Sequence, residues 1–141
     1  MPVTIEDQLA LQDLTTRYAQ HLSRHEVGDL VDLFVPDAIY HAFNTDYSMA
    51  EFPALLDSAP RGQLIVNPPL VDVVDDDGTG SQHYIFIDQR THDMRLAWYD
   101  DIYRRTPQGW RFVRRTTTFL RRHGGVDHGK EHDPVRGTGQ G

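Results

Sequence analysis

Apolar and polar residues alternate with a period of two over a long stretch from Arg95 to Phe119. The alternation is interrupted at Thr106-Pro107-Gln108-Gly109, where proline and glycine occupy positions typical of a β-turn. The pattern therefore predicts two long strands joined as a hairpin. The first strand has two chemically different faces. One face carries Leu96, Trp98 and Ile102, and the other carries Tyr99, Asp101 and Tyr103.

The first third of the chain has helical rather than strand periodicity. An amphipathic helix is predicted from Thr4 to about Arg24, and a shorter helical pattern begins at Val27 and is expected to stop at Pro36. Ser48 and Glu51 resemble a capping box, which predicts a third helix directly after them. Three helices are therefore expected before the main run of strands.

The remaining segments read as strands separated by turns. The candidate strands are residues 38–43, 63–67, 70–74, 83–89, 95–105 and 110–120. The run Asp75–Gly80 is a strong hairpin signal. Helices followed by a meander of strands imply an α+β fold, with helices packed on one face of a bent antiparallel sheet. We expect one domain over residues 1–122 and a flexible tail rich in glycine and histidine over residues 123–141.

Composition and charge narrow the class of protein. The chain has 141 residues, is 38% hydrophobic, and contains no cysteine, so a disulfide framework and thiolate metal sites are excluded. No apolar run approaches the roughly 20 residues that span a bilayer, and the N-terminus does not resemble a signal peptide. The net charge of -7 argues against a nucleic-acid surface. We therefore expect a cytoplasmic protein without membrane or nucleic-acid partners.

The order of the segments and their residue sequences resemble those of the NTF2-like superfamily, in its SnoaL-like branch, and most closely those of the scytalone dehydratase family. The resemblance covers about residues 5–120 and is carried by RYAQHLSRHEVGDLVDLFVPDA, AEFPALL, FIDQR and YRRTPQGWRF. It implies a cone in which three N-terminal helices pack on a strongly curved antiparallel sheet and enclose a cavity. It also implies a dehydratase, isomerase, cyclase or epoxide hydrolase that acts without a cofactor on a polyketide-, steroid- or terpenoid-like molecule.

The resembling family's catalytic residues are mostly absent from the matching positions. Its tyrosine, aspartate, two histidines and asparagine fall, in that order, on Leu22, Ser23, Gln63, Asp88 and Tyr99. A strand tyrosine persists as Tyr40. The resemblance therefore implies different acid/base machinery, and dehydration of scytalone itself is not expected.

Asp88 is the strongest candidate for a general base. It ends the apolar run Tyr84–Ile87, and a carboxylate at the rim of an apolar cavity has its pKa raised by desolvation. Such a group is suited to proton abstraction next to a carbonyl. The alternative is a surface aspartate that pairs with Arg90 or Arg95.

Three further side chains are candidates for polarising a substrate. Tyr40 and Tyr99 can donate hydrogen bonds to a developing oxyanion; the alternative for both is core packing with a solvated hydroxyl. His41 follows Tyr40, so only one of the two can face inward in a regular strand. If His41 faces inward, it becomes the partner of Asp88. Tyr18, on the first helix, is a candidate substrate contact.

Further polar residues are candidates for binding the substrate. Asp101 lies on the face predicted to line the cavity, but it could instead pair with Arg114 or Arg115 across the hairpin. Gln63 and Asn67 share one strand face and could bind a substrate carbonyl or hydroxyl. The alternative for these two is backbone capping before the following prolines.

No metal or cofactor is expected from the motifs. His21 and His25 lie one helical turn apart, a spacing that can bind metal, but no HExxH motif accompanies them. The histidines after residue 122 lack supporting structure for a zinc site. The chain has neither a glycine loop for phosphate nor a GxSxG motif, which disfavours a nucleotide cofactor or an acyl-serine mechanism.

Two partner predictions complete the sequence analysis. A small hydrophobic molecule is the expected ligand, whether the protein is an enzyme or a non-catalytic module that binds an apolar ligand or a protein partner. A homodimer is expected through the outer sheet surface. Trp98, Ile102, Trp110 and Phe112 are assigned to that surface.

Overall fold

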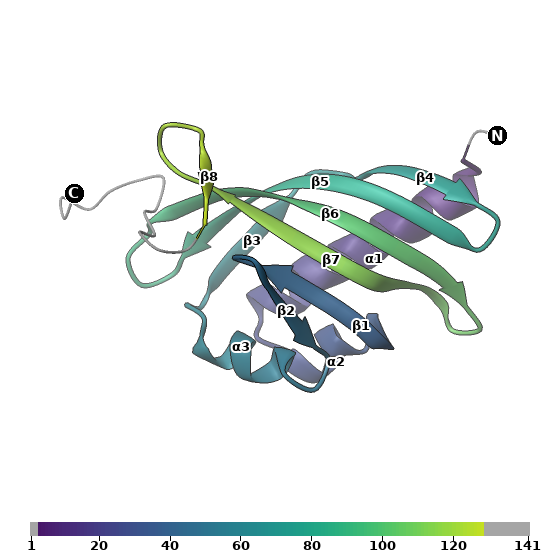
Figure 1. Cartoon of the computed structure of the whole chain (residues 1–141), viewed down its shortest axis with the longest axis horizontal. Coiled ribbons are helices and arrows are strands. Elements are labelled where there is room, and N and C mark those ends of the chain that lie inside the picture. The colour runs from purple at the N-terminus through teal and green to yellow at the C-terminus, as the bar shows by residue number, and fades with distance from the viewer. Residues whose placement is uncertain (1–2, 129–141) are drawn as a thin grey trace.

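The computed structural model describes residues 3–128 and shows three helices and eight strands in that range (Figure 1). The helices are α1 (Ile5–Ser23), α2 (Val27–Val31) and α3 (Phe52–Ser58). The strands are β1 (Phe34–Ala42), β2 (Thr45–Ser48), β3 (Gly62–Val66), β4 (Leu70–Val74), β5 (Asp77–Asp88), β6 (Met94–Thr106), β7 (Gly109–Leu120) and β8 (Val126–Asp127).

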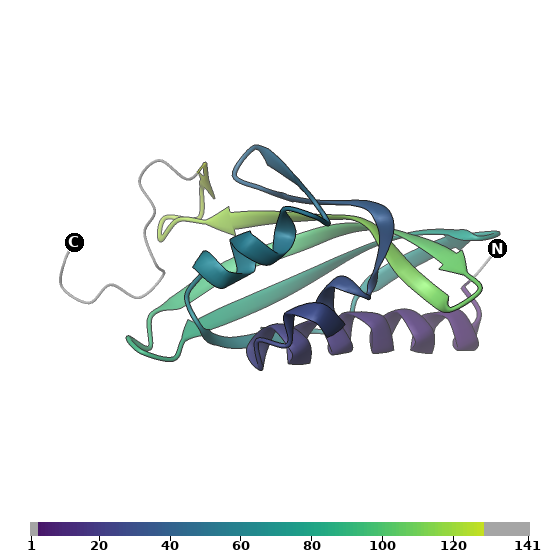
Figure 2. The same ribbon diagram turned by 90° about the horizontal axis from the view of Figure 1, so that it is seen from below.

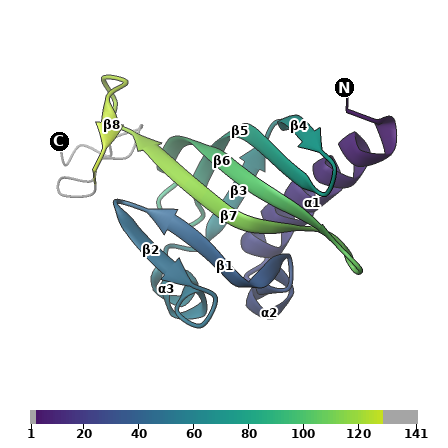
Figure 3. The same cartoon turned by 45° about the vertical axis from the view of Figure 1, so that its right-hand side comes forward.

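The strands form one curved sheet with the helices on its concave side. Its order is β2-β1-β7-β6-β5-β3, while β4 pairs with β5 and β8 pairs with β7. Figure 2 shows the three helices together on one side of the sheet. The sheet is antiparallel except between β1 and β7, which lie side by side and run parallel (Figure 3). The predicted α+β architecture is confirmed, with this one parallel pair as a difference.

The predicted helix starts are present. The Thr4 hydroxyl accepts a hydrogen bond from the Asp7 N–H at 3.1 Å and caps α1. Ser48 and Glu51 exchange two backbone-to-side-chain hydrogen bonds, as a capping box requires. Because α3 begins only after Glu51, Pro53 falls in its first turn, where the missing N–H costs no intrahelical bond.

The hairpin of β6 and β7 confirms the inward face predicted for β6. Tyr99, Asp101 and Tyr103 are buried there, whereas Ile102 is 44% exposed. The assignment of Trp110 and Phe112 to the outer surface is wrong, since both are buried in the core. Phe112 lies opposite Tyr103, so Trp110 and Phe112 share the inward face of Tyr103. The register shift between Ile102 and Tyr103, typical of a β-bulge, comes after both residues and puts Arg115 on the same inward face. The dimer stays a prediction, and its remaining support is Trp98 and Ile102.

Three other boundaries differ from the sequence analysis. Pro36 does not end a helix, because α2 stops at Val31 and Pro36 lies within β1. The strand expected from residue 83 begins at Asp77, and its Gly80 leaves room for Tyr103, whose hydroxyl would lie 2.6 Å from an added Cβ. Beyond residue 122, β8 pairs with β7 and buries Asp127. The rest of the expected tail, residues 129–141, lies outside the described residues.

One end of the cone is closed by an ionic tie, called here the Asp7 tie, between α1 and the hairpin. Arg105 donates two hydrogen bonds to the Asp7 carboxylate, at 2.7 and 3.0 Å, and Trp110 Nε1 donates a third at 3.1 Å. The bond from Arg105 is the main reason that the pKa of Asp7 falls to about 2. Both carboxylate oxygens are therefore satisfied. Within residues 3–128, no helix is long and apolar enough to cross a membrane.

Candidate active site

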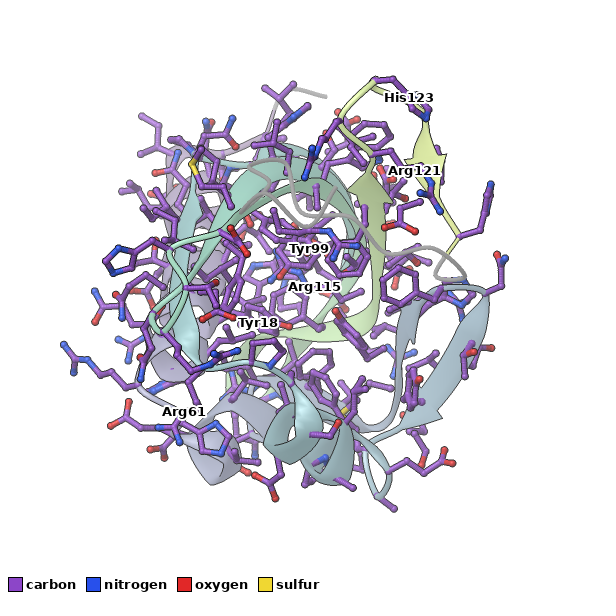
Figure 4. All side chains as sticks on the ribbon, turned by 90° about the vertical axis from the view of Figure 1, so that its left-hand side faces the viewer. Tyr18, Arg61, Tyr99, Arg115, Arg121 and His123 are labelled. Atoms are coloured by element: carbon purple, nitrogen blue, oxygen red, sulfur yellow. The ribbon has the colours of Figure 1, made fainter. Side chains whose placement is uncertain are left out.

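The opposite end of the cone holds a cavity of about 310 Å³ between the helices and the concave face of the sheet. Its walls are mainly apolar and include Leu55 from α3, Phe86 from β5 and Phe119 from β7. Figure 4 views the molecule from the side of the β5–β6 loop, and Tyr18, Tyr99 and Arg115 lie at the centre of the ring formed by sheet and helices. The cavity predicted from the fold resemblance is thus present.

Four buried tyrosines meet on the inner side of the cavity. We call Tyr18, Tyr40, Tyr84 and Tyr99 the phenol cluster. The rings of Tyr84 and Tyr99 stack with their centroids 4.4 Å apart, and Tyr18 meets Tyr99 edge to face at 5.7 Å. The Tyr40 hydroxyl shares a hydrogen bond of 2.8 Å with the Thr117 hydroxyl. Helix α1 and three different strands therefore bring phenolic oxygens to one place.

The phenol cluster consists of protonated hydrogen-bond donors. Burial is the main cause that raises the pKa of all four phenols above its ordinary value, so they carry no charge near neutral pH. The Tyr18 hydroxyl is buried close to that of Tyr99, yet within residues 3–128 it makes no hydrogen bond of good geometry. A buried hydroxyl without a partner is costly, and an acceptor oxygen in the cavity would satisfy it.

A buried arginine lies behind the phenol cluster. The guanidinium carbon of Arg115 is 3.5 Å from the ring centroid of Tyr99 and 4.2 Å from that of Tyr18. Its Nε pairs with Asp101 at 3.3 Å, and its Nη2 donates to Gln82 Oε1 at 2.7 Å. Arg115 and Asp101 are fully buried at their side chains. We call this pair the Arg115 pair.

Asp101 takes the salt-bridge alternative that the sequence analysis left open. It pairs with Arg115 directly across the hairpin and does not line the cavity wall. Burial raises its pKa to about 6, although the charge of Arg115 and a 2.9 Å hydrogen bond from the Tyr103 hydroxyl both oppose the rise. Arg115 had no role in the sequence analysis beyond this possible pairing, because its position behind the tyrosines depends on the long-range register of the sheet.

Two histidine–carboxylate pairs lie at the mouth of the cavity. The Nδ1 atom of His21 is 3.0 Å from Glu26 Oε1, and the Nε2 atom of His25 is 2.9 Å from Asp57 Oδ1. Both histidines contribute to the cavity wall from the last turn of α1 and the residues just after it. The spacing of the two histidines indicates only a joint metal site, so their pairing with Glu26 and Asp57 was not predicted. The acidic residue directly after His25 is the sequence signal for the first of these pairs.

One group at the mouth has ligands that could meet a metal ion. The possible ligand atoms of His21, Glu26 and Asp29 lie within 4.8 Å of one another. Asp29 is exposed, and the Nδ1 atom of His21 already faces Glu26. His21 and Glu26 therefore form a hydrogen-bonded pair in this structure.

Asp88 lies in the cavity wall, but its environment differs from the prediction. Its Oδ1 accepts hydrogen bonds from the N–H groups of Arg90 at 2.8 Å and Thr91 at 3.1 Å. Burial favours a higher pKa, but these backbone bonds outweigh it and hold the pKa of Asp88 below its ordinary value. The predicted rise in pKa is therefore wrong, because the carboxylate organises the turn after β5.

The register of β1 decides between Tyr40 and His41. Tyr40 faces inward, whereas His41 lies outside the cavity wall and pairs through Nδ1 with Asp46 Oδ1 at 2.6 Å. His41 is therefore not the partner of Asp88. This outcome follows from the alternation of a regular strand, in which only one of two neighbours can point into the cone.

Gln63 and Asn67 do not reach the cavity. Both are exposed, because β3 points Gly62 and Leu64 inward instead. The Asn67 side chain accepts a hydrogen bond from the His83 N–H at 3.1 Å, which is the backbone-capping alternative. Of the predicted site residues, the cavity therefore brings together Tyr18, Tyr40, Tyr99 and Asp88.

Known structures share this architecture. An NTF2-like protein with a cystatin-like fold from Novosphingobium aromaticivorans has a TM-score of 0.69 and 25% identity, over 82% of this chain and 83% of that one. A candidate scytalone dehydratase of the same species has a TM-score of 0.73 and 16% identity, over 92% of each chain. A type 2 hexachlorocyclohexane dehydrochlorinase has a TM-score of 0.72 and 15% identity, over 92% of this chain and 95% of that one.

Sequence comparison gives a relative and a family. An uncharacterized protein of Mycobacterium tuberculosis (strain H37Rv) is 28% identical over 128 residues, which cover 81% of this chain and 86% of the relative. The model of the SnoaL-like domain matches residues 3–116. This range includes the three helices, strands β1 to β6, β7 as far as Thr116, and all four tyrosines of the phenol cluster. This chain therefore belongs to the SnoaL-like domain family.

Proposed function

We propose that this protein is an enzyme that moves protons on a hydrophobic, ring-bearing small molecule held in the cone cavity, without a cofactor. One observation supports the proposal most strongly. The same apolar cavity has protonated phenols inside it and histidine–carboxylate pairs at its mouth. The resemblance that favours a dehydratase, isomerase, cyclase or epoxide hydrolase points in the same direction, as do structural relatives named for dehydration and dehydrochlorination. Polyketide-, steroid- and terpenoid-like ketones suit the size and polarity of the cavity.

His21 is the proposed base. Glu26 accepts a hydrogen bond from Nδ1–H, which leaves the lone pair of Nε2 free to take a proton. His21 lies one helical turn beyond Tyr18 on the same side of α1, and both residues contribute to the cavity wall. A substrate can therefore span the two groups.

The proposed step is abstraction of a proton from the carbon next to a carbonyl. His21 Nε2 takes the proton, and the electron pair of the C–H bond moves into the carbonyl system to give an enolate. Tyr18 and Tyr99 donate hydrogen bonds to the oxygen on which the charge develops. Return of the proton to another carbon gives isomerisation, and departure of a hydroxide or halide from the next carbon gives elimination.

Deuterium exchange tests the proposal without knowledge of the natural product. Cyclic ketones of steroid, polyketide and terpenoid type are incubated with the protein in D2O, and loss of the proton beside the carbonyl is followed by NMR. We expect His21→Gln to slow the exchange about a hundredfold, as is typical for loss of a general base. His83→Gln is the matched control, since His83 is exposed on the outer face beside Trp98. Equal rates in wild type and His21→Gln would contradict the proposed base.

Asp88→Asn provides a comparison within the same assay. The lowered pKa of Asp88 makes it the weaker base, so we expect a smaller loss than for His21→Gln. A loss larger than that of His21→Gln would restore Asp88 as the base.

The second candidate function is a non-catalytic module that binds an apolar ligand. It is favoured by Ser23, which stands at the position of the resembling family's aspartate and accepts a hydrogen bond from the Leu64 N–H at 2.9 Å. Saturable binding of the ketones without exchange in any of them would favour this function over the enzyme.

A further inference from the structure

Within the cavity, the Tyr18 hydroxyl is a buried donor without a well-aligned acceptor in the described part of the chain. The Tyr18 side chain is 0% exposed to solvent, and its hydroxyl makes no hydrogen bond of good geometry within residues 3–128, although the Tyr40 and Tyr99 hydroxyls lie near it. In Figure 4, Tyr18 and Tyr99 lie near the centre of the ring that the sheet and the helices form. Because buried hydroxyls are nearly always paired, this donor indicates a ligand atom that accepts a hydrogen bond.

The charge behind the tyrosines indicates what kind of acceptor fits. The guanidinium of Arg115 lies against the ring faces of both Tyr99 and Tyr18. Its counter-ion Asp101 contacts Nε and is itself held by the Tyr103 hydroxyl. The positive charge therefore lies against the tyrosines, and this favours negative charge on an oxygen that accepts from their hydroxyls.

The shape and polarity of the cavity limit the rest of the ligand. The wall includes ionisable residues (His21, His25, Arg61, Asp88, Asp93 and Arg95), but most of the remaining lining is aromatic or aliphatic, as at Phe52 and Phe86. Phe52 stacks on Tyr40 with ring centroids 4.5 Å apart, which forms a flat apolar surface. A planar ring with one acidic oxygen matches a site with one unpaired buried donor better than a carboxylate, which brings two charged oxygens to be desolvated.

We propose that the phenol cluster, backed by Arg115, is a binding site for the oxyanion of a phenol or enol on an aromatic or cyclic ligand. This inference shares its cavity with the proposed function and names the substrate class that the cavity selects. Tyr18 and Tyr99 donate to the anionic oxygen, the ring lies along the apolar wall, and Arg115 acts as a positioning residue through the tyrosine rings.

The experiment uses 4-nitrophenol, whose ionised form is coloured, and measures its ionisation by absorbance with and without an excess of the full-length protein. We expect the wild type to bind the phenolate at least about tenfold more tightly than the neutral phenol, so that bound probe ionises at lower pH than free probe. Equal affinity for the two forms, preference for the neutral form, or absence of binding would overturn the proposal.

Variants separate the anion site from general binding in the cavity. Tyr18→Phe should reduce the preference for the phenolate several-fold and leave binding of neutral phenol nearly unchanged. Tyr47→Phe is the matched control, because Tyr47 on β2 also contributes to the cavity wall but lies outside the phenol cluster, and this variant should keep the preference. Arg115→Met/Asp101→Asn removes the charge together with its counter-ion and should lose the preference. An unchanged preference in Tyr18→Phe or in the double variant would contradict the assignment.

Two further readouts distinguish the possible failures. Thermal melting of each variant verifies that it is folded before its binding is interpreted. Tighter competition by 4-nitrobenzoate than by 4-nitrophenol would assign the site to carboxylates and overturn the proposal. Because ionisation of the probe is measured without turnover, phenolate binding without deuterium exchange refutes the proposed enzyme alone. Exchange without phenolate preference refutes this inference alone.

Discussion

Two regions of the cone each hold a pair of a carboxylate and an arginine, but the pKa of the carboxylate is shifted in opposite directions in the two pairs. In the Asp7 tie at the closed end, Arg105 is 40% exposed at its side chain and holds the carboxylate with two hydrogen bonds. In the Arg115 pair beneath the cavity, both side chains are fully buried and meet at a single contact of 3.3 Å. The pKa of Asp7 falls to about 2, whereas that of Asp101 rises to about 6.

The two regions differ in how completely their buried polar groups are hydrogen-bonded. At the closed end, hydrogen bonds outweigh desolvation, so the ionised carboxylate stabilises the folded chain. Beneath the cavity, desolvation outweighs pairing, and Arg115 Nη1 has no hydrogen-bond partner within residues 3–128. A buried pair of this kind contributes little net stability, and its place against Tyr18 and Tyr99 gives it a use in the site.

The largest effect is expected when the Arg115 pair is broken. Arg115→Met leaves Asp101 buried without a counter-ion and should lower the free energy of unfolding by about 3 kcal/mol or more. Arg115→Met/Asp101→Asn should recover most of that loss, because it removes both charges. Denaturant titration of the two variants measures this. A single variant as stable as the wild type would show that the pair is not desolvated.

A smaller effect is expected at the closed end. Asp7→Asn weakens the bonds from Arg105 and Trp110 and should lower the free energy of unfolding by roughly 1.5–3 kcal/mol, the range for hydrogen bonds to charged groups. Asp13→Asn is the matched control, since the Asp13–Arg17 pair on α1 is about 60% exposed at both side chains. It should change stability by less than about 0.5 kcal/mol. Equal losses for the two variants would remove the special role of the Asp7 tie.

The pH dependence of stability should distinguish the two carboxylates by sign. The lowered pKa of Asp7 gives stability that is present above about pH 4 and is lost as the pH falls toward 2. The raised pKa of Asp101 acts in the opposite sense, because ionisation is disfavoured in the folded state, and its cost appears as the pH rises from about 4 through 6. Denaturant titrations of wild type, Asp7→Asn and Asp101→Asn across this range test the signs. A wild type that gains stability from Asp101 between pH 4 and 6 would contradict the assignment.

Local patterns in the sequence predicted much of this architecture. The alternation in residues 95–119 identified the inward face of β6, and the Ser48–Glu51 capping box placed the start of α3. The parallel pairing of β1 with β7 was missed, because residues far apart in the chain make it and no local period encodes it. The register set by the turn was missed as well: Trp110 lies opposite Arg105 and Phe112 opposite Tyr103, so both share the inward face of Tyr103 and not the outer face of Ile102.

The candidate site was predicted less completely than the fold. Tyr18, Tyr40 and Tyr99 were found because period and resemblance placed them on inward faces. Tyr84 was treated only as part of an apolar run. The pKa of Asp88 was predicted in the wrong direction, because backbone N–H groups of a tight turn cannot be recognised from strand periodicity.

A crystal structure of the protein with bound 4-nitrophenol tests most directly whether the phenol cluster binds the oxygen of a phenol. We expect the phenol oxygen to lie within hydrogen-bond distance of the Tyr18 hydroxyl, at about 2.5–3.0 Å, with its ring against the apolar wall formed by Phe52 and Phe86. A probe bound elsewhere, or bound in the cavity with its oxygen toward the mouth and Tyr18 still without a partner, would contradict the assignment of the phenol cluster as the site.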